Sequence, residues 1–569
     1  MDITYKKTNN SQLFENLENP ELLNMKNCQN YVPLYNNFFK LNSTNYNNIN
    51  LNNQNGLHTI TKKISENRFK GAIKTDNDNI VEKDIFFKLS PLLDPFKYLA
   101  GKYDLCEFKL PKFEERNEYT KIDDPNNAAY VDSFFTYLTS QLLNHKDFIH
   151  GLDFYGSYIG IKNEYHIDIG EDLEMLSNSD FFHNNKNLYK FINSEHEELF
   201  NDQSRSNKKA ISLGDDIDDV SILNLEDIQE IQETQDIEDI EEIQNKDLKV
   251  ESNNVVIDLS NSSLLYENDN IKDSKSTRSS DSNISSRSSN TENSDEENDD
   301  EHDSDECSES SSGSSEPDAI MVSVKEFPVQ IISLECCENT FDDLLANDKL
   351  SDEELTCIII QILMMLITYQ KLFSLTHNDL HTNNIMYIKT EKRYLYYKYN
   401  DKHYKVPTFG KIFKIIDFGR AIYKYRDNLI CSDSFHPDGD AATQYNCEPY
   451  YNSNKSIVEP NMSFDLCRLG CSIYDFIIDE YENHKDKMIP IHKIITDWCF
   501  DDEGKNMLYK NNDEERYPDF KLYKMIARKV HKHIPDKVIN NKVFNKYIVP
   551  KKEIKKGSKI MNIDTLDLN

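Results

Sequence analysis

The sequence lacks several features that would place it in a class at once. Its eleven cysteines form no CxxC pair, which excludes a zinc knuckle and indicates reduced thiols. The longest apolar run, Leu355–Gln370, is too short for a membrane span and predicts a buried helix. The first twenty residues contain no apolar leader segment, so we expect an intracellular protein that is not secreted.

Positive charge is also scarce. The chain has 65 Lys and Arg residues against 100 Asp and Glu residues, a net charge of −35. Binding to nucleic acid or to an anionic membrane requires clustered cations, so neither partner is expected. Hydrophobic residues make up only 38% of the chain, which predicts that part of it is disordered.

The expected disordered part is an acidic, serine-rich insert over residues 176–326. The stretch Thr291–Glu306 holds ten acids in sixteen residues, and its charge repulsion disfavours a packed core. Ser294 and Ser304 precede acids and are candidate phosphorylation sites, and the insert is expected to attract basic partners. An isoleucine repeat over residues 228–243 is compatible with a short amphipathic partner helix or with a repeat in a disordered segment.

Outside the insert, strands come first and helices later, which is an α+β pattern. Three β-prone runs between His58 and Lys88 predict a meander, and apolar spacing predicts a helix over Asn126–His145. A second helix, within Ser351–Leu375, begins with a capping serine. Strands with a hairpin follow, and residues 463–550 are expected to be mostly helical.

A polar loop after the second helix carries the strongest chemical signal. It reads "THNDLHTNN", and "IIDFGRA" follows about thirty residues later. Alone, the loop is compatible with a metal site, a chance polar loop or a catalytic loop. Phosphoryl transfer to a hydroxyl requires an Asp near the acceptor, an amide oxygen for the metal and a second carboxylate. Asp379, Asn384 and Asp417 supply these groups in this order.

Together, "HNDLHTNN" and "IDFGRA" resemble the HRDLxxxN and DFG motifs of the protein-kinase superfamily. The Asn- and Ile-rich composition resembles that of kinase-like proteins of giant DNA viruses. The resemblance implies an α+β, bilobal fold with a small β-rich lobe and a mainly helical large lobe. It also implies an ATP- and magnesium-dependent protein kinase that acts on Ser/Thr of protein substrates, in the host cytoplasm or the virion.

On this basis the chain divides into five parts. They are an Asn-rich extension (1–56), the kinase-like small lobe (57–175), the acidic insert (176–326), the end of the small lobe with the hinge and the large lobe (327–545), and a tail (546–569).

The resemblance assigns roles to individual residues. Asp379 would be the catalytic base or orient the acceptor hydroxyl, and Asn384 and Asp417 would bind magnesium. Lys88, at the end of the third strand, would contact the α- and β-phosphates of ATP, with Asp132 as its candidate ion-pair partner.

The nucleotide-binding loop fits the family less well. Gly71 matches its last glycine, with Ile73 in the position of the family's valine. Glu66 and Arg68 replace the first two glycines, which weakens the expected backbone cradle for the phosphates.

Further candidates come from the strand end "LECCEN" and from "FDLCRLGCSIYDF". Glu335 and Cys337 are expected near the adenine base. Asp465 is expected to brace the catalytic loop, and Gly470 matches the glycine of the same family helix.

Two residues of the loop depart from the family pattern. Asn378 replaces an Arg that grips a phosphorylated activation segment, so we expect activity that is independent of phosphorylation after Gly419. His381 replaces a phosphate-contacting Lys and is a further catalytic candidate, partly charged near neutral pH. The loop also resembles those of aminoglycoside and choline phosphotransferases and haspin-like kinases. A small-molecule phosphotransferase therefore stays open as an alternative. The two missing glycines of the nucleotide-binding loop keep a pseudokinase scaffold open as well.

Overall fold

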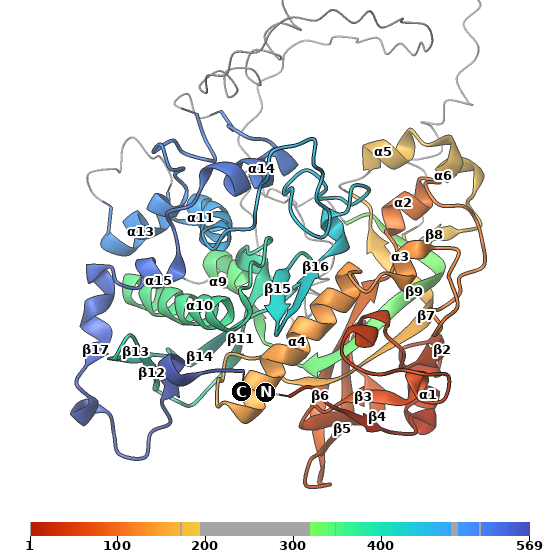
Figure 1. Cartoon of the computed structure of the whole chain (residues 1–569), viewed down its shortest axis with the longest axis horizontal. Coiled ribbons are helices and arrows are strands. Elements are labelled where there is room, and N and C mark those ends of the chain that lie inside the picture. The colour runs from red at the N-terminus through yellow and green to blue at the C-terminus, as the bar shows by residue number, and fades with distance from the viewer. Residues whose placement is uncertain are drawn as a thin grey trace, which may run out of the picture. The chain divides into compact units, whose positions relative to one another are not determined.

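The computed structural model describes residues 2–170, 173–193, 319–347, 349–478, 488–510 and 514–568. Most of the expected acidic insert lies outside the described residues, and so do the two candidate phosphorylation sites, Ser294 and Ser304, and the isoleucine repeat. The described residues form a mixed α and β structure (Figure 1).

A curled seven-stranded sheet is built mainly from the first part of the chain. Its strands are β2 (Met25–Gln29), β4 (Asn55–Lys63), β5 (Arg68–Thr75), β6 (Ile80–Pro91), β7 (Phe154–Asp168), β8 (Tyr189–Phe191) and β9 (Met321–Glu335). Their order is β2-β7-β9-β6-β5-β4, and β8 pairs with β9. The antiparallel pairs β4–β5 and β5–β6 confirm the predicted meander.

Residues at the start of the chain are part of this packing. They form β1 (Tyr5–Lys7), α1 (Ser11–Glu18), η1 (Pro33–Asn37), η2 (Tyr46–Asn48) and β3 (Ile49–Leu51). Leu13 and Leu17 of α1 are buried, as are Val32, Leu34 and Tyr35. The aromatic and aliphatic side chains of this Asn-rich segment therefore join the core.

Helix α4 (Ala128–His145) lies beside the sheet and contacts β7 and β9. Its amino end is capped by Asn127, whose side chain accepts a hydrogen bond from the Ala129 N–H. Two short helices precede it, α2 (Pro95–Leu99) and α3 (Thr120–Asp123). We call residues 92–127 the 92–127 segment.

Regular structure extends into both edges of the range expected for the insert. Helices α5 (Leu173–Ser177) and α6 (Asp180–Asn184) follow β7, and Phe182 is buried. Strand β8 pairs with Val322–Val324 of β9. These edges form structure because Phe182, Tyr189 and Phe191 supply apolar surface that the acidic stretch lacks.

Helices dominate the later part of the described chain. They are α9 (Phe341–Asn347), α10 (Asp352–Phe373), α11 (Phe464–Ile477), α13 (Pro490–Trp498), α14 (Phe520–Lys529) and α15 (Pro535–Val538). Single 3-10 turns also occur, at η4 (Thr382–Asn384), η5 (Asp433–Phe435), η6 (Lys542–Tyr547), η7 (Lys551–Glu553) and η8 (Ile563–Thr565).

Helix α10 is the predicted apolar helix. The Ser351 hydroxyl accepts a hydrogen bond from the Glu354 N–H at 3.2 Å and caps it, as predicted. By length and composition α10 could cross a membrane, but 83% of its most apolar window is buried inside the protein. It therefore packs as a core helix.

Three small sheets complete the fold. They are β10 (Asn339–Thr340) with β11 (Ile385–Lys389) and β14 (Lys411–Ile415), β12 (Tyr394–Tyr399) and β13 (Lys402–Pro407) with β17 (Ile548–Val549) and β18 (Met561–Asn562), and β15 (Ile422–Tyr425) with β16 (Asn428–Cys431). The predicted hairpin at Asn400 and Asp401 is confirmed, with both residues at positive φ. Strands β17 and β18 of the tail region pair with this hairpin.

Candidate active site

The strand pair β11–β14 brings the two predicted magnesium ligands to the same end of one sheet. Ile385 pairs with Ile415, and the Ile416 N–H donates to the Asn384 carbonyl oxygen at 3.0 Å. Asn384 directly precedes β11, and Asp417 lies two residues after β14. The two motifs, separate in sequence, therefore meet through backbone pairing.

A buried carboxylate holds the backbone of the loop that precedes Asn384. Asp465, in the first turn of α11, accepts hydrogen bonds from the His377 N–H at 3.0 Å and the Asn378 N–H at 2.9 Å. It is fully buried, and the predicted bracing of the loop is confirmed. Gly470 lies further along α11, where a Cβ atom would come within 2.9 Å of the Trp498 Cβ. Its small size therefore serves close packing between α11 and α13.

Lys88 contacts two carboxylates from different elements. Its Nζ lies 2.8 Å from the Asp132 Oδ2 of α4 and 3.0 Å from the Asp417 Oδ1. Burial works to lower the pKa of Lys88, but the two carboxylates raise it above its ordinary value. The predicted pairing of Lys88 with Asp132 is confirmed.

Helix α4 is also bonded to the residues that follow Asp417. The Asp132 Oδ1 accepts a hydrogen bond from the Phe418 N–H at 2.7 Å. The Tyr423 hydroxyl donates to the Val131 carbonyl oxygen at 3.0 Å, and the rings of Phe135 and Phe418 lie 4.5 Å apart. The position of α4 and the position of this segment therefore depend on each other.

Asp379 is buried but surrounded by groups that favour its charged form. The Tyr523 hydroxyl donates to its Oδ1 at 2.7 Å, and an Arg420 guanidinium nitrogen lies 3.8 Å from its Oδ2. Burial alone would raise the pKa of Asp379, but Arg420, Arg468 and the Tyr523 hydroxyl hold it below its ordinary value. Asp379 is therefore ionised at neutral pH.

The side chain of Asn384 is fixed by two hydrogen bonds. Its Nδ2 donates to the Asp379 carbonyl oxygen at 2.9 Å and lies 3.1 Å from the His381 Nε2. Both side-chain amide hydrogens are thereby used, which leaves the side-chain Oδ1 for a metal ion. Burial lowers the pKa of His381 to about 4, so its ring is neutral near pH 7 and its Nε2 can accept. His381 thus orients a candidate metal ligand and does not provide the predicted partial charge.

Asn378 makes neutral contacts where the family pattern has a cation. Its Nδ2 donates to the Arg420 carbonyl oxygen at 2.9 Å, and its Oδ1 accepts from the Tyr445 hydroxyl at 2.7 Å. Its backbone adopts a positive φ of 64°, which asparagine tolerates well. Asn378 therefore fastens the segment after Gly419 without a phosphate.

Gly71 does not lie in a turn, contrary to its predicted place at the end of a phosphate-binding loop. The turn between β4 and β5 is closed by hydrogen bonds from the Ile64 and Ser65 N–H groups to the Arg68 carbonyl oxygen. Gly71 lies inside β5, where a Cβ atom would be 2.5 Å from the Thr59 carbonyl oxygen. A glycine is present there because two strands approach closely.

Ile73 lies on the wrong face of the sheet for the predicted role. It pairs with Val81, seven residues before Lys88 on β6. Because successive side chains of a strand point to opposite faces, Ile73 and Lys88 face opposite sides of the sheet. Ile73 is buried in the hydrophobic core.

Glu335 and Cys337 lie at the end of β9, as predicted, but their contacts are with protein groups. The Glu335 Oε1 is 2.5 Å from the Lys414 Nζ and accepts from the Asp153 N–H at 2.7 Å. The Cys337 carbonyl oxygen accepts from an Arg68 guanidinium nitrogen at 3.0 Å. The Glu335 side chain therefore ties β9 to β14 and does not point to a free site.

A cavity of about 1150 Å³ adjoins the cluster. Its lining includes Lys88, Asp132, Asp379, Asp417 and Arg420, together with residues of the 92–127 segment and of residues 433–440. Gly71, Ile73, Glu335 and Cys337 are not among its lining residues.

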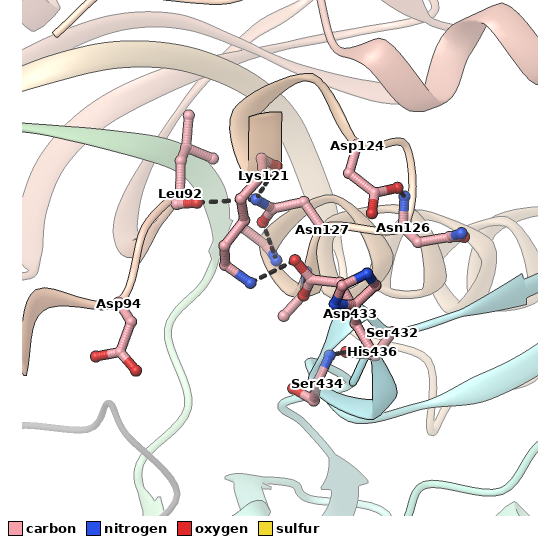
Figure 2. Close-up of polar contacts among 12 residues, drawn as sticks. Leu92, Asp94, Lys121, Asp124, Asn126, Asn127, Ser432, Asp433, Ser434 and His436 are labelled. Carbon is pink, nitrogen blue, oxygen red and sulfur yellow. Dashed lines mark hydrogen bonds and ion pairs between the residues drawn. The ribbon is translucent and has the colours of Figure 1, made fainter. Parts of the chain in front are cut away.

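The 92–127 segment and residues 433–440 both line this cavity. Contacts between them centre on Asp433 (Figure 2). Its Oδ1 accepts from the Ala128 N–H at 2.9 Å, and its Oδ2 forms an ion pair with Lys121. The Asp433 N–H donates to the Asn126 carbonyl oxygen at 2.7 Å.

Sequence reasoning missed Arg420, Tyr523 and Asp433 as residues of this region. Arg420 was visible directly after the glycine of "IDFG", and its position beside Asp417 was a usable signal. Tyr523 reaches Asp379 across 144 residues of sequence, and Asp433 reaches Ala128 across 305. No local pattern marks such distant contacts.

The chemistry of the cluster fits magnesium and phosphate. In the part of the chain that the structure describes, no group of three His, Cys, Asp or Glu side chains forms an all-protein metal site. Magnesium usually takes only one or two protein oxygens and completes its shell with water and phosphate. The side-chain Oδ1 of Asn384 and the Asp417 carboxylate are suited to that role.

Comparison with protein-family models gives no match for the chain, and comparison with curated proteins gives none either.

Proposed function

We propose that this protein is an ATP- and magnesium-dependent protein kinase with a bilobal fold, transferring the γ-phosphate of ATP to Ser/Thr hydroxyls. The sheet with α4 would be the small lobe, and the elements from α9 onward the large lobe. The observation that carries the proposal is the double contact of Lys88 with Asp132 and Asp417. Kinases need both the lysine–helix pair and the metal-binding aspartate in place.

The roles of the residues follow from their contacts. Lys88 has three ammonium donors, and its two carboxylate contacts leave one for a phosphate oxygen. Asn384 and Asp417 would hold the magnesium ion. When bound, ATP would supply the phosphoryl group, and magnesium would supply the positive charge that neutralises the phosphate oxygens.

Asp379 would act on the acceptor hydroxyl. Its Oδ1 already accepts from Tyr523, so the Oδ2 is the atom that takes the hydrogen bond from the acceptor. Its lowered pKa keeps it ionised and suits it to orienting the hydroxyl. The acceptor oxygen forms a bond to the γ-phosphorus, the bond to the β,γ-bridging oxygen breaks, ADP leaves, and the hydroxyl proton passes to Asp379 and then to solvent.

Transfer of label from γ-labelled ATP tests this function. Acceptors should include the protein itself, generic Ser/Thr proteins, aminoglycosides and choline, so that the assay decides the acceptor class. Asp379→Asn should lower the rate about 100-fold or more with the fold intact. The matched control is Asp427→Asn, an exposed aspartate between β15 and β16. Equal rates for wild type and Asp379→Asn would refute the proposal, and label transfer only to the small molecules would redirect it to a small-molecule phosphotransferase.

One observation favours a second candidate, a noncatalytic scaffold. Arg68 donates to the Cys337 carbonyl oxygen at 3.0 Å and to that of Glu338 at 3.3 Å. These carbonyls lie where the family resemblance expects the adenine. A scaffold would show no turnover and no magnesium-dependent nucleotide binding, whereas Arg68→Ala should tighten nucleotide binding in an enzyme.

A further inference from the structure

The buried side chain of Asp433, in the segment after Asp417, contacts the amino end of α4. Only 4% of Asp433 is exposed. Its carboxylate meets the Ala128 N–H, the first residue of α4, and the Lys121 ammonium group. Figure 2 shows Asp433 and Lys121 facing each other beside Asn127, the capping residue of α4.

The position of Asp433 matters because α4, which it contacts, also carries Asp132. Ala128 and Asp132 are four residues apart, about one helical turn, so they lie on the same face about 6 Å apart along the axis. Asp132 holds both Lys88 and the Phe418 N–H. A constraint on the first turn of α4 therefore acts on the cluster through a short, rigid path.

A carboxylate suits this place for two reasons. The amino end of a helix has unpaired N–H groups and a partial positive charge, so it favours an anion. Lys121 adds a full positive charge. A phosphate on a neighbouring residue would offer the same kind of contact, and Asp433 provides it permanently.

Two further side chains, Asn378 and Arg420, also hold the segment. Asn378 joins the Arg420 carbonyl oxygen to the Tyr445 hydroxyl through neutral hydrogen bonds. Arg420 pairs with Asp440 at 2.6 Å. Asn378 and Arg420 therefore hold this segment near the loop through hydrogen bonds and an ion pair that need no phosphate.

We infer that Asp433 is a positioning residue that takes the place of a phosphorylated residue: it locks the segment after Asp417 to α4 and thereby holds Asp132 on Lys88. The inference rests on the proposed function for its kinetic consequences. Its structural consequences can be measured without turnover.

The test compares Asp433→Asn, Asp433→Ala, Asp433→Glu and Lys121→Met with wild type, and uses Asp427→Asn as the matched control. Two readouts are needed, kcat and KM for magnesium-ATP and amide hydrogen exchange at Ala128 and Phe418. We expect Asp433→Ala to lower kcat roughly 10-fold or more with a smaller change in KM. We expect the Phe418 N–H to exchange faster as well, and Asp433→Glu to recover part of both effects. Phosphatase treatment of wild type should leave kcat unchanged.

Faster exchange at Ala128 with unchanged exchange at Phe418 would overturn the inference, since Asp433 would then have only a local role. A wild-type kcat that falls after phosphatase treatment would also overturn it. Absence of turnover in wild type would instead refute the proposed function, and the exchange data would still decide whether Asp433 couples α4 to Phe418. Asp433→Asn and Lys121→Met, which are close to their parent side chains in size, keep the test valid if Asp433→Ala does not fold.

Discussion

Lys88 on β6 and Asp132 on α4 form an ion pair in which the Nζ and Oδ2 atoms are 2.8 Å apart. Asp132 is 3% exposed and Lys88 is 16% exposed, so neither charge is well solvated. The pair joins the sheet to the helix that lies beside it, and the same lysine reaches Asp417. Lys88 therefore both links the helix to the sheet and lies in the candidate active site.

Breaking this pair by replacing one partner should destabilise the fold more than replacing both partners. Lys88→Met leaves Asp132 buried without its cation, which costs about 3–5 kcal/mol in the free energy of unfolding. Lys88→Met combined with Asp132→Leu should regain part of that stability, less about 1–3 kcal/mol for the Phe418 N–H left without its acceptor, but no phosphate transfer. Denaturant unfolding and the labelled-ATP assay check the two parts. A double variant that is as unstable as the single one would contradict the account.

Removing Asp465 should loosen the loop that carries Asp379. Asp465→Ala leaves the buried His377 and Asn378 N–H groups without acceptors, each at a cost of about 1–3 kcal/mol. We expect a lower free energy of unfolding and loss of transfer. Asp475→Ala, on the same helix but away from the loop, is the control variant and should retain transfer. Full activity of Asp465→Ala would show that the bracing is dispensable.

Two buried histidines should make the protein less stable in mild acid. Burial lowers the pKa of His150 and of His381 to about 4, whereas an unfolded histidine titrates near 6.5. The unfolded state therefore binds more protons between about pH 6.5 and 4, and stability falls as the pH falls through this window. Each histidine contributes about 3 kcal/mol to the change. His150→Gln should flatten the dependence by that amount in unfolding experiments, and His58→Gln at an exposed position is the control. An unchanged slope for His150→Gln would contradict its burial as a neutral ring.

Gly71→Ala should destabilise the sheet by about 1–3 kcal/mol, because its Cβ would meet the Thr59 carbonyl oxygen at 2.5 Å. Gly56→Ala on β4, where the nearest atoms are 3.9 Å away, should have little effect. Thermal unfolding of the two variants measures the difference. Equal stability of both variants would contradict the close approach of Gly71 to Thr59.

The sequence predicted the elements with strong local signals. Apolar runs and a capping serine located α10, and the turn pair Asn400–Asp401 located the hairpin. Asp379, Asn384 and Asp417 were found because each belongs to a motif of fixed spacing, and β11–β14 pairing brings the motifs together.

The sequence did not predict the features that depend on strand register or on contacts between distant segments. The family spacing placed Gly71 at the end of a loop, but the turn of the β4–β5 hairpin lies before Arg68, and Gly71 is inside β5. The strand register also places Ile73 on the face of the sheet opposite to Lys88. Burial by surrounding residues, which no local pattern reveals, makes His381 neutral. The contacts of Tyr523 with Asp379 and of Asp433 with α4 join segments far apart in the chain.

The central claim is that Lys88, Asn384 and Asp417 hold magnesium-ATP for transfer by the loop of Asp379. The most direct measurement is magnesium-dependent transfer of label from γ-labelled ATP by wild type and by Asp417→Asn, with folding checked by circular dichroism. We predict transfer that requires magnesium and that falls about 100-fold or more in Asp417→Asn. Transfer at the same rate by Asp417→Asn, or none by wild type with any acceptor, would contradict the account.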